Sequence, residues 1–277
     1  MISGDLRKMQ ATVEGVKNVA YKMRIGENLV PLNDHIGKKV SLSFSGAIHC
    51  IHCGKTSKKS FSQGFCFPCF KKLAACDSCI MSPEKCHFHK GTCREPEWAE
   101  VHCMQGHYVY LANSSALKVG ITRGDQLPTR WLDQGATQAR PIFHVANRRL
   151  SGLVETLFKE VVADKTNWRN MLKGLDIEFD MYREQERLIE LVYEGLDSLQ
   201  TEFGIEAIED LSDKNETHEF HYPVLEYPTK ITSINAEKTP LVEGTLMGIK
   251  GQYWILDTGV INIRKYTGYE AKLAIQE

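Results

Sequence analysis

Three features are missing from this 277-residue sequence. No apolar run approaches the ~18 residues that a membrane-spanning helix needs, so we expect no membrane association. No apolar stretch precedes a small-residue cleavage site near the first residue, so we expect no secretory signal and a cytoplasmic location. Internal repeats and low-complexity tracts are also missing, and the composition is that of an ordinary globular protein.

An excess of either charge is missing too, because the net charge is only −1. The charges are nevertheless unevenly spread. Residues 1–75 hold 12 Lys/Arg against 4 Asp/Glu, whereas residues 151–222 hold 7 against 18. A basic front half could face a polyanion such as DNA or RNA. Equally, the acidic and basic faces could dock onto each other or stay solvated, and zinc-bound thiolates would cancel part of the basic charge.

Cysteine is absent outside residues 50–103, which hold all nine cysteines. In a cytosolic protein, close cysteine pairs favour metal or redox chemistry over disulfides. "CIHC" and "CFPC" place two pairs on tight turns, separated by twelve residues. Four thiolates in a tetrahedron suit Zn²⁺, and two pairs on a ribbon favour zinc over an iron–sulfur cluster. The sequence therefore predicts a zinc-ribbon site with the ligands Cys50, Cys53, Cys66 and Cys69.

A second group of candidate ligands follows immediately along the chain. It begins with another C-x-x-C turn, and four cysteines would complete a second structural zinc site. The expected ligands are Cys76, Cys79, Cys86 and Cys93, and the alternatives are His89, Cys103 and His107. A redox dithiol is disfavoured because neither pair lies at a thioredoxin-like strand-to-helix turn. Neither site has an evident open coordination position, so both zinc ions are expected to be structural.

The remaining segments predict an α+β fold. Residues 1–47 and 223–277 are β-rich, since "VAYKMRI" and "KVSLSFSG" alternate apolar and polar residues and glycines punctuate short strands in the tail. These two segments could complete one β-domain, which the sequence leaves open. Residues 48–106 hold the double zinc module, and residues 176–222 form an acidic helical segment.

Residues 107–175 have the pattern β-β-α-β-α. The expected strands cover residues 107–112, 117–122 and 141–147. Helices are expected where Pro128 and Gly135 bracket a short segment, and where apolar residues recur at helical spacing from residue 150. A long helix should follow this core and end at Gly204.

The core carries motifs in a recognisable order: "YVYL", then "LKVGIT", then an arginine on a helix, then a glutamate on a second helix. Over residues 107–170 it resembles the GIY-YIG nuclease superfamily, in the branch whose second motif is K-I-G. The whole chain is also similar to an uncharacterised bacterial family in which "GTCREPEWAE", "VYLANSSALKVGITR" and "RWLDQGA" occur in this order. That family supplies no function.

The superfamily resemblance implies a metal-dependent phosphodiesterase acting on nucleic acid. It would make Tyr110 the first-motif tyrosine, with Tyr108 as the alternative, and would start the second motif at Lys118. Arg130 would grip phosphate oxygens. Glu155 would hold one Mg²⁺ or Mn²⁺. Two departures stand out, because Tyr108 replaces the first-motif glycine and Lys118 replaces the second-motif tyrosine.

Each of these residues also has a purely structural explanation. The tyrosines alternate like any strand aromatics, Arg130 could pack on Trp131, and Glu155 could be an exposed helix residue. The alternative function is therefore a non-catalytic zinc-ribbon adaptor that binds nucleic acid or a protein. The catalytic hypothesis requires Tyr110, Lys118, Arg130 and Glu155 to converge on one face.

Overall fold

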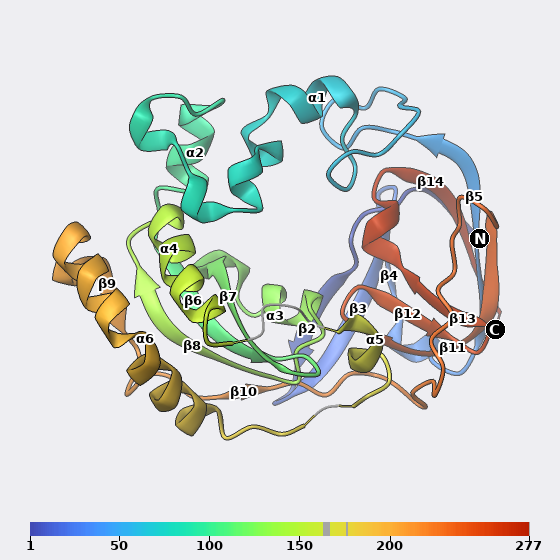
Figure 1. The fold of residues 1–277 in the computed structure, drawn as a ribbon. Helices are drawn as coiled ribbons and strands as arrows, with labels where there is room; N and C mark the ends of the chain where they lie inside the picture. Colours follow the sequence, from blue (N-terminus) through green and yellow to red (C-terminus); the bar gives the residue numbers. More distant parts are fainter. Residues whose placement is uncertain (163–166, 176, 277) are drawn as a thin grey trace.

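Strands from both ends of the chain form one six-stranded antiparallel sheet (Figure 1). We analysed a computed structural model that describes residues 1–162, 167–175 and 177–276. In spatial order the strands are β1 (Ile2–Asp5), β14 (Tyr269–Ile275), β5 (Lys39–Ile48), β11 (Leu241–Lys250), β12 (Tyr253–Leu256) and β13 (Gly259–Asn262). Because β5 lies between β14 and β11, the segments 1–47 and 223–277 belong to one β-domain.

A second, three-stranded sheet completes this β-domain. It consists of β2 (Gln10–Glu14), β3 (Asn18–Ile25) and β4 (Asn28–Pro31). In β3, buried and exposed side chains alternate from Tyr21 to Ile25, as a strand with one buried face requires. Two short 3₁₀ helices, η1 (Asn33–His35) and η8 (Ile263–Tyr266), turn the chain beside the sheets.

The central segment has the predicted order β-β-α-β-α. Its elements are β6 (His107–Asn113), β7 (Leu117–Arg123), the 3₁₀ turn η6 (Gly124–Gln126), α3 (Thr129–Asp133), β8 (Gln138–Val145) and α4 (Arg148–Lys159). Strand β6 lies between β7 and β8, and β7 is an edge strand. The short strands β9 (Ile208–Asp210) and β10 (His218–Glu219) pair with the edge of β8 that faces away from β6.

The two faces of the central sheet are buried against different partners. Val109, Leu111 and Val119 point to one face and pack against α4 and α6 (Met181–Phe203). Tyr110 and Ala112 point to the other face, where they join the apolar cluster of the β-domain. This division follows from the period-2 alternation of a strand, and it makes the central sheet share a core with the β-domain.

Helix boundaries follow local capping chemistry. The Asn147 side chain accepts a hydrogen bond from the backbone N–H of Leu150 (3.0 Å) and starts α4. Asp180 caps α6 in the same way (3.1 Å to Arg183 N), and α6 ends at Gly204, which has φ +96°, as predicted. The short helix α5 (Trp168–Met171) and the 3₁₀ turn η7 (Ile205–Ala207) flank α6.

The cysteine-rich segment arches from the end of β5 to the start of β6, connecting the β-domain with the core (Figure 1). Its regular elements are all short and helical: α1 (Phe67–Lys72), η2 (Ala74–Cys76), η3 (Ser78–Ile80), η4 (Pro83–Lys85), η5 (Phe88–Lys90) and α2 (Pro96–His102). No residue between 50 and 106, all of which are described, belongs to any of the three clusters of buried apolar side chains.

The α+β class is confirmed, with antiparallel sheets throughout. Within the described ranges, we find no helix with the combination of length and apolarity that a membrane span demands. The boundary expected between residues 175 and 176 adjoins Asp176, which lies outside the described residues.

Candidate functional site

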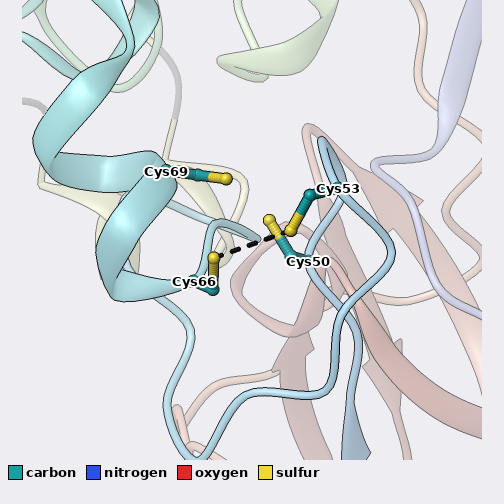
Figure 2. A group of neighbouring side chains, drawn as sticks. All are labelled: Cys50, Cys53, Cys66 and Cys69. Atoms are coloured by element: carbon teal, nitrogen blue, oxygen red, sulfur yellow. Dashed lines mark hydrogen bonds between the residues drawn. The ribbon is translucent and has the colours of Figure 1, made fainter.

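The four cysteines Cys50, Cys53, Cys66 and Cys69 lie together (Figure 2). Their sulfur atoms are all within 4.8 Å of one another, and the Sγ atoms of Cys53 and Cys66 are 3.8 Å apart. A tetrahedral Zn²⁺ with Zn–S bonds of about 2.3 Å separates its sulfur ligands by about 3.8 Å. The four cysteines could therefore hold a metal ion such as zinc.

Each cysteine pair is positioned by a local turn. After β5, the backbone N–H of Gly54 donates to Cys50 O (2.9 Å), which closes the first turn. Cys66 directly precedes α1 and Cys69 lies in its first turn, where Phe70 N donates to Cys66 O (2.9 Å). The second pair thus stands on a helix start, a different support from the paired turns that the sequence predicts.

Backbone N–H groups prepare one of these thiols for a cation. Burial raises the pKa of Cys50, but hydrogen bonds from the backbone N–H groups of Cys53, Cys66 and His52 together outweigh burial and lower the pKa to about 6. The pKa of Cys69 is raised, first by burial and then by the neighbouring thiols. Four thiolates cannot coexist here without a compensating positive charge, which a bound metal ion would supply.

The second predicted set, Cys76, Cys79, Cys86 and Cys93, is not brought together so closely. Only Cys79 belongs to another compact group, with Asp77 and His87. Burial raises the pKa of Cys76, the Arg94 charge opposes this shift, and the charge of Cys50 adds to it.

Among the alternative ligands, His89 is exposed at the surface, whereas Cys103 and His107 are buried. His107 hydrogen-bonds Gln105 O through Nδ1 (2.7 Å). Its Nε2 atom is buried without a hydrogen-bond partner in the described structure.

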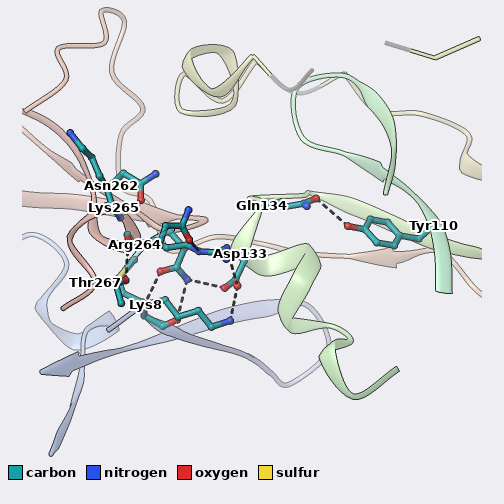
Figure 3. A network of polar contacts seen from close by, with 11 residues as sticks. Lys8, Tyr110, Asp133, Gln134, Asn262, Arg264, Lys265 and Thr267 are labelled. Carbon is teal, nitrogen blue, oxygen red and sulfur yellow. Dashed lines mark hydrogen bonds and ion pairs between the residues drawn. The ribbon is translucent and has the colours of Figure 1, made fainter. Parts of the chain in front are cut away.

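In the core, the Tyr110 side chain is fully buried and lies over Gly120, its cross-strand neighbour on β7. A Cβ atom on Gly120 would lie only 2.6 Å from the Tyr110 hydroxyl. That hydroxyl donates a hydrogen bond to Gln134 Oε1 (3.3 Å; Figure 3). Glycine at position 120 is therefore required by the close approach of the tyrosine ring.

Arg130 of α3 and Glu155 of α4 both lie within electrostatic reach of Tyr110. Burial raises the pKa of Tyr110, the adjacent Arg130 guanidinium opposes this shift, and the Glu155 carboxylate adds to it. Arg130 and Glu155 thus both lie within electrostatic range of Tyr110, although α4 packs on the opposite face of the central sheet from the Tyr110 ring.

Tyr108 and Lys118 flank this region on the same face of the sheet as Tyr110, because they lie at alternate positions of β6 and in register on β7. Lys118 is buried opposite Ala112. Tyr108 is only partly buried, and its ring lies against that of His144, with 5.0 Å between centroids.

Glu155 is the one candidate ligand for Mg²⁺ or Mn²⁺ that the sequence predicts. Its carboxylate is 13% exposed and pairs with Lys159 at 3.1 Å. Mg²⁺ is often bound through one or two carboxylates, and water and substrate oxygens then complete its coordination shell. A single glutamate could therefore hold Mg²⁺ only if water and substrate supply the remaining ligands.

Sequence reasoning missed the role of Arg148, the first residue of α4. Its backbone N–H donates to Cys103 O (2.8 Å), and its Nη2 donates to Ile80 O (2.7 Å). The side chain is partly buried between the cysteine-rich segment and the core, and burial lowers its pKa. In the sequence, the single hint of this role is that Arg148 directly follows Asn147, the residue that caps α4.

A second unpredicted network ties α3 to the β-domain (Figure 3). Asp133 accepts hydrogen bonds from Lys8 Nζ and Gln252 Nε2, both at 2.8 Å, and lies 3.9 Å from Arg264 Nη1. Arg264 Nε in turn donates to Gln63 Oε1 of the cysteine-rich segment (2.7 Å).

No curated protein and no solved structure matches the chain at significant similarity. A family model does match residues 37–271, which include the cysteine-rich segment, the core and most of the shared sheet. On that match over most of its length, the chain belongs to the family described as protein of unknown function DUF2797.

Proposed function

We propose that the core hydrolyses phosphodiester bonds of nucleic acid and that the Cys50 quartet is a structural zinc site beside it. The main support is that Arg130 and Glu155, from two different helices, both lie within electrostatic range of the buried Tyr110 hydroxyl. The order of the elements and the motif residues of the core supports the same proposal, through their resemblance to the GIY-YIG nucleases.

Each residue has a role that its position allows. Arg130 is partly exposed and can bind two non-bridging phosphate oxygens at once. Tyr110 is buried with a raised pKa, so it orients its neighbours, while the partly exposed Tyr108 can contact the attacking water. Glu155 would hold Mg²⁺ or Mn²⁺, which would neutralise charge on the phosphate.

The test is cleavage of labelled DNA and RNA by the purified protein in Mg²⁺ or Mn²⁺. We expect Glu155→Gln and Arg130→Gln to lose at least about 100-fold in rate, as is typical when a charged catalytic group is removed. Glu160→Gln is the matched control, because Glu160 is exposed at the end of the same helix. Equal cleavage by wild type and Glu155→Gln would overturn the proposal.

One observation favours the alternative, a non-catalytic nucleic-acid adaptor. The cysteine-rich segment carries exposed lysines between the two cysteine pairs of the quartet and directly after the second pair, namely Lys55, Lys58, Lys59, Lys71 and Lys72. Such a surface binds phosphates without sequence preference, and its affinity falls steeply with salt. Salt-sensitive binding that survives Arg130→Gln, with no cleavage by any preparation, would support the adaptor over the enzyme.

A further inference from the structure

The cysteine-rich segment lacks the usual means of holding a fold together. Its buried apolar side chains are mostly cysteines: Cys50, Cys66, Cys76, Cys86 and Cys103, beside Leu73, Pro83 and two alanines. All nine thiols are free, so disulfides do not replace the missing core. A segment of this length without a core generally needs a metal or covalent cross-links. The last cysteine of the Cys50 quartet lies in α1, so residues 73–103 have no metal ligand from that quartet and no covalent cross-link.

Arg148 connects the backbone beside Cys79 with the backbone of Cys103. Its backbone N–H binds the carbonyl of Cys103, at the end of α2, and its guanidinium binds the carbonyl of Ile80, next to Cys79. Helix α4 also packs directly against η4 at Gly152. A Cβ atom added to Gly152 would lie only 2.4 Å from the backbone nitrogen of Glu84.

A closed loop brings Cys86 and Cys93 together. Between them, His87 and Thr92 are joined by a side-chain contact (Nδ1 to Oγ1, 2.8 Å) and by a hydrogen bond from Thr92 Oγ1 to His87 O (3.3 Å). Cys86 and Cys93 therefore lie at the two ends of a loop that these two contacts close.

Asp77 then ties that loop to Cys79. Its carboxylate lies 2.6 Å from Arg94 Nε and 3.6 Å from His87 Nε2. Because Arg94 follows Cys93 and His87 follows Cys86, this one carboxylate holds both cysteines near the turn that carries Cys79.

The electrostatics agree with this placement. Burial raises the pKa of Cys79 to about 11, with contributions from the charges of Asp77, Cys86 and Cys103. Burial also raises the pKa of Cys103, with contributions from Cys86 and Cys93. The charge of Cys50, in the first quartet, contributes instead to the raised pKa of Cys76.

We propose that Cys79, Cys86, Cys93 and Cys103 form a second zinc site with four cysteine ligands and that Cys76 is not a ligand. No three of these sulfurs, all in described residues, lie within 4.8 Å of one another, unlike those of the first quartet, so this site must close when the ion binds. Rotation between cysteine rotamers moves a sulfur atom by about 3 Å, which is enough to close such a set around an ion. On binding, the thiols release their protons to solvent and four Zn–S bonds form.

The compact group of Asp77, Cys79 and His87 is a weaker ligand set. The Asp77 carboxylate is already paired with Arg94, and His87 Nδ1 is engaged by Thr92. These contacts position the loop that carries the cysteines. A zinc ion on Asp77 would compete with the Arg94 ion pair, whereas zinc bound at His87 Nε2 would leave the Thr92 contact in place.

The test is the zinc content of the full-length chain, measured by native mass spectrometry and elemental analysis. We expect two zinc ions in the wild type and one in each of Cys79→Ser, Cys86→Ser, Cys93→Ser and Cys103→Ser. Cys76→Ser is the matched control and should keep two. One zinc in the wild type, or loss of one from Cys76→Ser but not from Cys103→Ser, would overturn the proposal.

Zinc-edge X-ray absorption on the wild type answers the same question without a variant that must fold. We expect a first shell of sulfur alone at about 2.3 Å. A nitrogen or oxygen contribution, together with loss of zinc from His87→Ala or Asp77→Asn, would contradict the assignment in favour of the Asp77 group.

Discussion

Gly120 controls where the Tyr110 ring lies, and this contact can be tested directly. Gly120→Ala places a methyl group 2.6 Å from the Tyr110 hydroxyl and 2.7 Å from Cζ. We expect this overpacking to cost about 1–3 kcal/mol in the free energy of unfolding, measured by urea denaturation. The same substitution in a Tyr110→Ala background should cost less, because the clashing ring is gone. Equal costs in both backgrounds would show that the ring is not the obstacle.

His107 makes stability depend on pH. Burial lowers the pKa of His107 to about 4, from an unfolded value near 6.5, so the unfolded chain takes up the proton first. Its contribution is therefore complete above about pH 6.5 and is lost as the pH falls toward 4, by about 3 kcal/mol in total.

We expect His107→Gln to flatten the pH dependence of the unfolding free energy between about pH 4 and 6.5. Both proteins are measured at the same zinc concentration, so acid-driven metal loss cancels in the difference. Parallel curves for the two proteins would contradict the role assigned to His107.

At the scale of elements, α4 joins the cysteine-rich segment to the core through Gly152. A Cβ there would meet backbone and ring atoms of Glu84 and Pro83 at 2.4–2.8 Å. We expect Gly152→Ala to destabilise the protein by about 2 kcal/mol or more, because backbone atoms cannot move aside.

Gly195 of α6 is the matched control for this prediction. The three atoms nearest to its added Cβ all belong to the flexible Leu157 side chain, at 2.7–3.3 Å, and alanine favours a helix. Gly195→Ala should therefore change the unfolding free energy by no more than about 1 kcal/mol. Similar losses for the two variants would argue against a rigid contact at Gly152.

Zinc removal should loosen one segment only. Residues 50–106 contribute to none of the apolar clusters, so a chelator should raise their amide hydrogen exchange strongly. Strands β6 to β8 and helix α4 should keep most of their protection. Added zinc, but not magnesium, should restore the original pattern. A uniform rise in exchange along the whole chain would refute a local role for the metal.

At the scale of the whole molecule, Asp133 connects the core with both ends of the chain. Asp133→Asn leaves Lys8 and Arg264 without their shared carboxylate, and we expect the free energy of unfolding to fall by about 1–3 kcal/mol.

Thermal unfolding of the wild-type protein should be a single transition, because Tyr110 and Trp131 share an apolar cluster with the β-domain. Two separate transitions in the wild type would disprove that shared core.

The exposed pair of Arg123 and Asp125 provides the control for Asp133. These side chains are 3.3 Å apart and Asp125 is 62% exposed, so Asp125→Asn should change stability by no more than about 0.5 kcal/mol.

Local patterns in the sequence determined much of this molecule. Alternating apolar residues placed β3, β5, β6 and β7, and Gly204 ended α6, because strand and helix periods act within a few residues. The spacing of the first four cysteines likewise predicted a group that the structure brings together. Each of these features depends on neighbours in the chain, which a sequence displays directly.

Contacts between distant residues were decided only by the tertiary structure. β5 pairs with β11 and β14, which lie far along the chain, and Asp133 meets Lys8 and Gln252 in the same way. The proposed preference for Cys103 over Cys76 as a zinc ligand also rests on such a contact, the hydrogen bond from Arg148 N to Cys103 O. Packing free energy is summed over the whole fold, so no local pattern of residues could have specified these partners.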